Sequence, residues 1–192
     1  LHPDDVDIVK KYFQTLLQAE IHSPLEWRLS SKSGQYLACD FSSTVLLERG
    51  QIISILCFAR DVTQRKRAEE KYQLLLESAP DGIVLVNDKG EITLINNQTE
   101  VLFGYTRNEL LGKPIEILLP LRFRSKHQTH RKSYHTNSLV RPMGTGLELY
   151  GLRKDGTEFP ISLTTSAVLD EKGSPYALVG ITRDISEQKL AE

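Results

Sequence analysis

The side chains best suited to chemistry gather between residues 117 and 147. This stretch contains no acid, so a face rich in positive charge is expected there. Basic groups of this kind can hold an anion. A solvated helix whose acids lie elsewhere in the fold explains the same composition, and lone helical histidines are more often surface residues. The candidates are His127, His130, His135 and Arg141, together with Arg122, Arg124, Lys126, Arg131 and Lys132.

Other kinds of active site find little support. The chain has no Gly-rich phosphate-binding motif, no Cys/His metal spacing and no arrangement of Ser, His and Asp that indicates a triad. Its two cysteines, Cys39 and Cys57, lie in alternating apolar stretches and are expected to be reduced strand residues of a cytoplasmic protein. No catalytic residue and no metal site are predicted, and the fragment is expected to be non-enzymatic.

Composition limits the partners. The chain has 192 residues, 40% of them hydrophobic, and a formal net charge of -1, so a globally basic nucleic-acid binder is disfavoured. The longest apolar run, residues 52–59, is far shorter than the ~20 residues of a membrane helix, and no signal peptide opens the chain. We therefore expect no nucleic acid and no membrane as partners of this fragment.

Residues 64–79 are expected to form a connector helix. Asp61 and Thr63 are good helix-capping residues, strong helix formers follow, and Pro80 ends the run. Its apolar residues fall at a 4-3-4 spacing, which places a narrow coiled-coil-like seam on one side. Such a seam predicts a homodimer through the connector helices. The seam residues are Ala68, Tyr72, Leu75 and Ala79.

The end of the chain repeats the start of this connector. Residues 183–192 match residues 60–69 position for position, and turns such as Lys32-Ser33-Gly34 and Lys154-Asp155-Gly156 recur at an offset of 122 residues. A period of this length indicates tandem domains rather than a solenoid, whose repeats run ~20 to 50 residues. Each copy is expected to pass a signal from its last strand into a helix through Arg60, Asp61 and Thr63 or through Arg183, Asp184 and Ser186.

Alternating apolar residues predict the same three-stranded meander in both copies. In the first, a helix reaching about Glu20 precedes strands at 26–29, 36–46 and 52–59. Three strands and one helix seldom suffice for a core, so the chain is expected to begin inside a domain. In the second, a hairpin, short helices with a cap at Asn96 or Asn97 and a longer polar helix over 122–138 come first. The loop is expected at 141–146 and the strands at 147–152, 159–169 and 176–185.

This order of elements and the motifs along it resemble the PAS family with its C-terminal PAC portion. The resemblance covers about a hundred residues of the second copy and only the PAC half of the first, where Ser33 replaces the usual Asp of the turn. The motifs are Asp81-Gly82-Ile83, Asn96, Leu102-Phe103-Gly104-Tyr105, Glu109-Leu110-Leu111-Gly112, Leu119-Pro120, residues 153–160 and Arg183-Asp184-Ile185-Ser186.

The resemblance implies an α+β PAS fold, a five-stranded antiparallel sheet of order 2-1-5-4-3 with helices on one face, in tandem with the first copy incomplete. The expected parts are the C-terminal half of a first PAS domain (1–63), the connector helix (64–79), a complete second PAS domain (80–185) and the start of an output helix (186–192). Asp184 is also expected to pair with a basic residue near the incoming helix.

The function implied is that of a sensory and dimerisation module of a bacterial sensor histidine kinase, or next of a diguanylate cyclase or transcription regulator, whose effector is missing from this chain. Haem-binding PAS domains of oxygen sensors are similar, but Arg141 stands where their ligand histidine is and has no lone pair. A light-oxygen-voltage adduct needs a cysteine that the second copy lacks. The alternatives kept are a haem or flavin redox protein, another small-molecule ligand, and a ligand-free structural scaffold.

Overall fold

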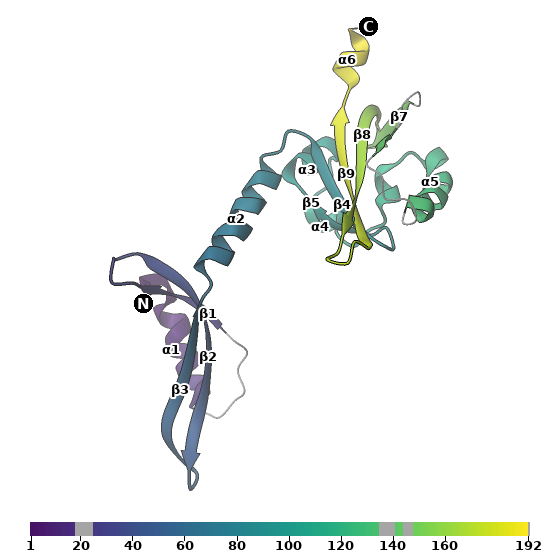
Figure 1. Ribbon diagram of the computed structural model, residues 1–192. Helices are drawn as coiled ribbons and strands as arrows, with labels where there is room; N and C mark the ends of the chain where they lie inside the picture. The colour runs from purple at the N-terminus through teal and green to yellow at the C-terminus, as the bar shows by residue number, and fades with distance from the viewer. Residues whose placement is uncertain (18–24, 135–140, 144–147, 192) are drawn as a thin grey trace. The chain divides into compact units, whose positions relative to one another are not determined.

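The computed structural model describes residues 1–17, 25–134, 141–143 and 148–191. The chain divides into two compact units, Leu1–Gln73 and Leu74–Glu192, and the division falls inside helix α2 (Thr63–Glu77; Figure 1). None of the described helices is long and apolar enough to cross a membrane.

The first unit is a three-stranded antiparallel sheet with one helix packed on a face. Tyr12 and Leu16 of that helix are buried against Trp27, whose ring stacks on Phe41 at 3.8 Å between centroids. The strand order is β1-β2-β3, as the meander predicts. The elements are η1 (Pro3–Asp5), α1 (Val6–Leu16), β1 (Leu25–Ser30), β2 (Tyr36–Glu48) and β3 (Gln51–Asp61).

The second unit is a larger antiparallel sheet with helices on one face. Its order is β5-β4-β9-β8, and both β6 and β7 then pair with β8 along the same side. The 2-1-5-4-3 order is therefore present, with its last position shared by two short strands. The strands are β4 (Gly82–Asn87), β5 (Ile92–Ile95), β6 (Arg141–Met143), β7 (Leu149–Leu152), β8 (Glu158–Leu169) and β9 (Pro175–Asp184).

Local sequence explains the helices of this unit. The Asn96 side chain caps α3, whose end is marked by Gly104 in the left-handed conformation at φ 74°. Thr106 and Glu109 form a capping box at α4. The helices are α3 (Asn97–Phe103), α4 (Arg107–Leu110), η2 (Ile115–Leu118), α5 (Leu121–Tyr134) and α6 (Ser186–Leu190).

The core of the second unit lies between the sheet and these helices. Val84, Ile92, Phe103, Leu110 and Phe159 are among its buried members. The expected loop at 141–146 is wrong for residues 141–143, which form β6 because they pair with Thr165, Thr164 and Leu163 of β8. A three-residue strand is too short to show an alternating apolar pattern in the sequence. Its pairing with β8 makes it a strand. The predicted ends of the first helix near Glu20 and of the polar helix at 138 lie outside the described residues.

Candidate functional site: the ends of the last strands

The end of β9 is tied directly to the start of α6. Asp184 Oδ1 accepts hydrogen bonds from the N–H of Ser186 at 2.8 Å and from its hydroxyl at 2.5 Å. The other carboxylate oxygen of Asp184 pairs with the Arg153 guanidinium at 2.8 Å. Partial burial acts to raise the pKa of Asp184, but the bonds from Ser186 and Arg153 outweigh it and hold that pKa below its usual value. Asp184 is therefore a charged joint between strand and helix.

The neighbouring residue, Arg183, contacts the segment by which the chain enters the second unit. Arg183 donates from Nε and Nη2 to the two oxygens of Asp81, each at 2.8 Å. Asp81 follows helix α2 and precedes β4, so this bidentate pair connects the last strand to the segment that enters the unit. The hydrogen bonds from Arg183 hold the pKa of Asp81 below its usual value.

The basic partner expected for Asp184 is thus assigned differently by the structure. Asp184 pairs with Arg153, which follows β7, and it is Arg183 that reaches the acid near the incoming helix. The reason is the pleat of the strand, which directs successive side chains to opposite faces of the sheet. The alternation of side chains along β9 shows that Arg183 and Asp184 face opposite sides of the sheet, but it does not show which side each one faces.

Asn96 holds the incoming segment from within. Its side chain is fully buried, and its Oδ1 accepts from the Ile83 N–H (2.8 Å), the Thr99 N–H (3.1 Å) and the Thr99 hydroxyl (2.8 Å). Its Nδ2 donates to the carbonyls of Leu76 (3.2 Å) and Asp81 (2.9 Å). The last turn of α2, the start of β4 and the start of α3 therefore share one side chain. The sequence predicts the cap but not these longer contacts.

A second clamp holds the same turn of α2. The carboxylate of Glu77 accepts from Arg107 Nη2 and from the Asn97 N–H, both at 2.6 Å. Arg107 also donates to the Ile95 carbonyl at 2.9 Å. Burial acts to raise the pKa of Glu77, but the Arg107 and Asn97 bonds hold it below its usual value. Glu77 and Arg107 were not singled out from the sequence, because their 30-residue separation leaves no local signal.

The first unit builds a similar joint with one member changed. Asp61 Oδ1 accepts from the N–H of Thr63, the first residue of α2, at 2.9 Å, and these bonds hold the pKa of Asp61 below its usual value. Asp61 lies opposite Cys39 on β2, as Asp184 lies opposite Ile161 on β8. The Ser31 N–H donates to Gln35, as the Arg153 N–H donates to Thr157. Ser31 therefore occupies the position of Arg153, so the first joint lacks that guanidinium.

Arg60 and three of the four seam residues are exposed. Arg60 lies opposite Asp40 on β2, and the relay residue next to it, Asp61, makes the cap described above. Tyr72 and Leu75 are each 62% exposed on α2. Ala68 is also exposed, whereas Ala79 is half-buried and lies just beyond the helix, its N–H donating to the Leu76 carbonyl at 3.3 Å.

The histidines are only partly described. His127 Nδ1 lies 3.0 Å from Oε1 of Glu116, a buried acid just before the acid-free stretch. Arg122 pairs with Glu158 at 2.6 Å, so this part of the basic face is matched by an acid from elsewhere in the fold. Helix α5 includes His130 and strand β6 includes Arg141, but their side chains lie outside the described set, as does all of His135. Within the described part of the chain, no group of three His, Cys, Asp or Glu side chains is placed to hold a metal ion.

A comparison with known families identifies the same fold as the sheet order and the helices on one face. The family model described as "PAS fold" matches residues 70–185, more than half of the chain. The chain belongs to the PAS fold family. The PAS fold and the family predicted from the sequence are confirmed.

Relatives of this PAS chain include signalling proteins. The sensor protein FixL of Bradyrhizobium diazoefficiens is 26% identical over 201 residues, which cover 100% of this chain and 39% of FixL. The cell-division control histidine kinase PdhS of Brucella ovis is 26% identical over 64% of this chain and 12% of its own length. The chain thus spans about two fifths of FixL and a smaller share of PdhS.

Solved structures agree in fold. A PAS domain from Colwellia psychrerythraea matches with a TM-score of 0.52 and 23% identity, covering 65% of this chain and 98% of that one. An RNA-binding light-oxygen-voltage receptor matches with a TM-score of 0.53 and 13% identity over 98% of this chain and 85% of its own. At these identities the likeness shows the PAS fold alone.

Proposed function

We propose that this chain is the sensory and dimerisation module of a signal-transduction histidine kinase, and that it relays a change in the PAS sheet into its helices. The observation that carries the proposal is the pair of adjacent residues at the end of β9. Arg183 binds Asp81 behind the incoming helix, and Asp184 binds Ser186 at the start of the outgoing one. A shift of this strand end would therefore alter both helices at once.

In this proposal the parts of the chain have separate tasks. Residues 1–63 are the C-terminal half of a first PAS domain, 64–79 the connector, 80–185 the second PAS domain and 186–192 the start of the output helix. The exposed Tyr72 and Leu75 support a homodimer through the connector, since two large apolar side chains on one side of a solvated helix favour a partner helix. A relay also needs two populated states of the joint.

A chimeric kinase tests the relay. The region of FixL that aligns with this chain is replaced by residues 1–192, and autophosphorylation is measured for the unchanged chimera and for Asp184→Asn. The asparagine can still accept from Ser186 but loses the charge that holds Arg153. We expect the rate to change by about fivefold or more, the usual size of coupling between sites.

The control for this experiment is Lys172→Gln, an exposed change in the turn before β9. It should leave the rate at that of the unchanged chimera. Equal rates for all three chimeras would contradict the relay and favour a purely structural scaffold.

A bound cofactor is the second candidate function. The His127–Glu116 contact supports it, because a carboxylate on one ring nitrogen leaves the other nitrogen free for a ligand. A visible absorbance band in the purified protein that His127→Ala abolishes would establish haem. A flavin spectrum would instead point to flavin held without a cysteine adduct, and absence of both bands would remove the redox alternative.

A further inference from the structure

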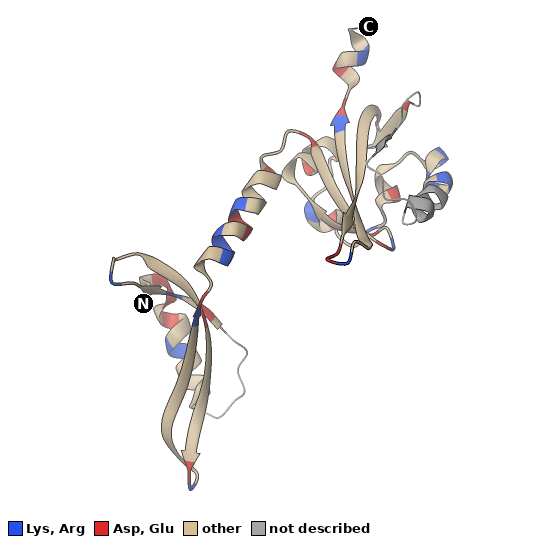
Figure 2. Ribbon diagram, in the orientation of Figure 1, with Lys and Arg blue, Asp and Glu red and all other residues tan. Residues whose placement is uncertain are grey.

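An ion pair between the sheet and the outgoing helix recurs at equivalent positions of the two units. In the first unit, Lys66 of α2 pairs with Glu26 of β1. In the second, Lys189 of α6 pairs with Glu148, the residue before β7. The glutamates lie 122 residues apart, as the two Gly-containing turns do, and the lysines lie 123 apart, as the two joint aspartates do. Figure 2 shows basic residues, in blue, on both helices.

Each outgoing helix is therefore held at two points, and in the second unit these points differ in accessibility. At the first point Asp184, whose side chain is 29% exposed, accepts from the Ser186 N–H at 2.8 Å. At the second, three residues further along α6, Lys189 is 34% exposed and Glu148 is 68% exposed. Exposed ion pairs contribute little to stability, so the second point opens more easily than the first. Opening it would let α6 turn about Asp184 while its first residue stays bound.

The lysines also act on the two acids. Lys66 holds the pKa of Glu26 below its usual value. Lys189 does the same for the pKa of Glu148, with a smaller contribution from the Tyr150 hydroxyl. Both glutamates are therefore charged at neutral pH, as the attraction to a lysine requires.

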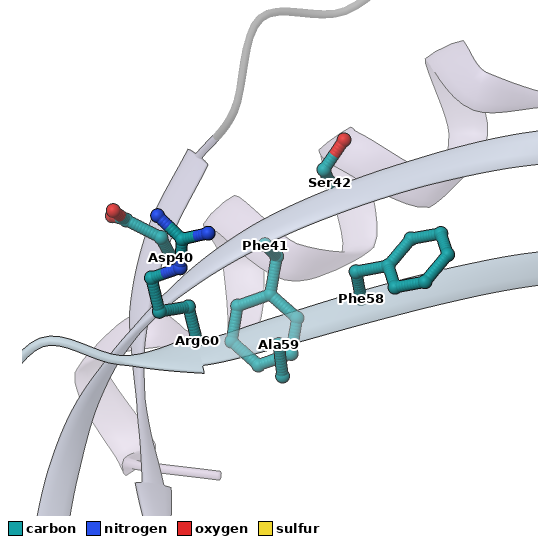
Figure 3. Close-up of a pocket in the computed structure, with 6 residues that line it drawn as sticks. All are labelled: Asp40, Phe41, Ser42, Phe58, Ala59 and Arg60. Atoms are coloured by element: carbon teal, nitrogen blue, oxygen red, sulfur yellow. The ribbon is translucent and has the colours of Figure 1, made fainter.

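The first pair is reinforced by a second acid and a second base. Arg65 Nη2 lies 3.4 Å from Oε1 of Glu26 and 3.5 Å from Oδ2 of Asp40. Asp40 lies opposite Glu26 in the register of β1 and β2. It lines one end of a pocket at the base of the hairpin, beside Arg60, and its carboxylate points away from the Phe41 ring (Figure 3). Glu26 and Asp40 therefore lie on one face of the sheet, where the start of α2 reaches both of them.

The second pair is supported in another way. At the positions of Asp40 and Arg65 the second unit has Ser162 and Gln188, which carry no charge. Instead, the Tyr150 hydroxyl donates to Glu148 at 3.2 Å, and the centre of the Tyr150 ring lies 6.0 Å from Nζ of Lys189. The attachment of α6 is therefore weaker in charge than the attachment of α2.

We infer that the Glu148–Lys189 pair is a latch that holds α6 in one of two positions about a pivot at Asp184, and that the matching pair of the first unit holds α2 more firmly. A weak contact suits this task, because it leaves both positions of the helix populated. The latch is a property of this chain, whereas its effect on a kinase rests on the relay proposed above.

Backbone 15N relaxation of the 192-residue chain tests the latch through the order parameters of the amides of residues 187–190. Glu148→Lys places like charges together, so these order parameters should fall from near the rigid value of about 0.85 towards about 0.6. Exchanging the charges, with Glu148→Lys and Lys189→Glu together, should restore them. Glu171→Lys, the same change in the exposed turn before β9, is the matched control and should leave them unchanged.

A second comparison tests the difference between the two units. The background Ser162→Asp with Gln188→Arg supplies the additional acid and base that the first unit has. In this background Glu148→Lys should lower the order parameters of residues 187–190 much less than it does in the unsubstituted chain, because the additional pair still holds the helix.

Three results would each overturn the inference: order parameters no lower for Glu148→Lys than for Glu171→Lys, no recovery when the charges are exchanged, or an equal fall in both backgrounds. The relay is judged separately, by autophosphorylation of the FixL chimera that carries Glu148→Lys. A loosened α6 with an unchanged rate would contradict the proposed relay and leave the latch standing.

Discussion

Arg183 and Asp81 are 102 residues apart in the sequence and are joined by two hydrogen bonds of 2.8 Å. The pair links the end of the last strand to the residue that follows the connector helix. Its carboxylate is largely covered, while the Arg183 side chain is 58% exposed. The contact therefore combines a defined geometry with ready access to solvent.

Replacing Arg183 with glutamine should lower the free energy of unfolding only slightly. Because solvent screens the exposed guanidinium, we expect only a small loss in the free energy of unfolding, measured by urea denaturation. Lys172→Gln, which removes an exposed charge from a turn, is the matched control and should lose less. A loss for Arg183→Gln no larger than the control's would show that the pair has no role in stability.

Asn96→Ala should be far more costly. The substitution leaves the Leu76 and Asp81 carbonyls and the Ile83 N–H without their side-chain partner in a buried place, so we expect a loss of about 3 kcal/mol. Denaturant unfolding of the second unit gives the value. Asn97→Ala, at the exposed neighbouring position, should cost about 0.5 kcal/mol or less; similar losses at both sites would contradict the role given to Asn96.

Acid should weaken the first unit through Asp5. Hydrogen bonds from Arg28 outweigh desolvation and lower the pKa of Asp5 from 3.8 to about 2. A carboxyl with a depressed folded-state pKa stabilises the fold above its unfolded pKa, and this contribution is lost as the pH falls from 3.8 towards 2. The Trp27 fluorescence should report a shallower pH dependence of stability in that window for Asp5→Asn. An unchanged slope would refute the assignment.

Leu75→Lys should weaken self-association through the connector. Leu75 is 62% exposed and shares the seam with Tyr72, while Leu74 is 70% exposed but lies off the seam. Leu74→Lys is therefore a control of the same chemistry on the neighbouring helical position. Sedimentation equilibrium should show a weaker dimer for Leu75→Lys than for Leu74→Lys. If both variants match the wild-type chain, the seam is only a surface stripe.

The sequence predicts those features that local patterns determine. The meanders and a cap at Asn96 or Asn97 follow from apolar alternation, turn residues and capping chemistry, and the PAS fold follows from the resemblance of the motifs to that family. The partners of Asp184 and Asn96 do not, because they depend on how segments far apart in the sequence are brought together. Strand β6 was likewise missed, since its pairing with β8 rather than its own composition makes it a strand.

Because Ser31 stands where the second unit has Arg153, the two joints are held by different ion pairs. Dissolved salt screens the Arg153–Asp184 attraction, since both side chains are partly accessible, 28% and 29% exposed. The first joint has no guanidinium in the place of Arg153, but Arg65 and Lys66 of α2 both pair with Glu26 of β1. Salt concentration is therefore expected to act on both helices, at the Arg153–Asp184 pair before α6 and at the Arg65 and Lys66 pairs at the start of the connector.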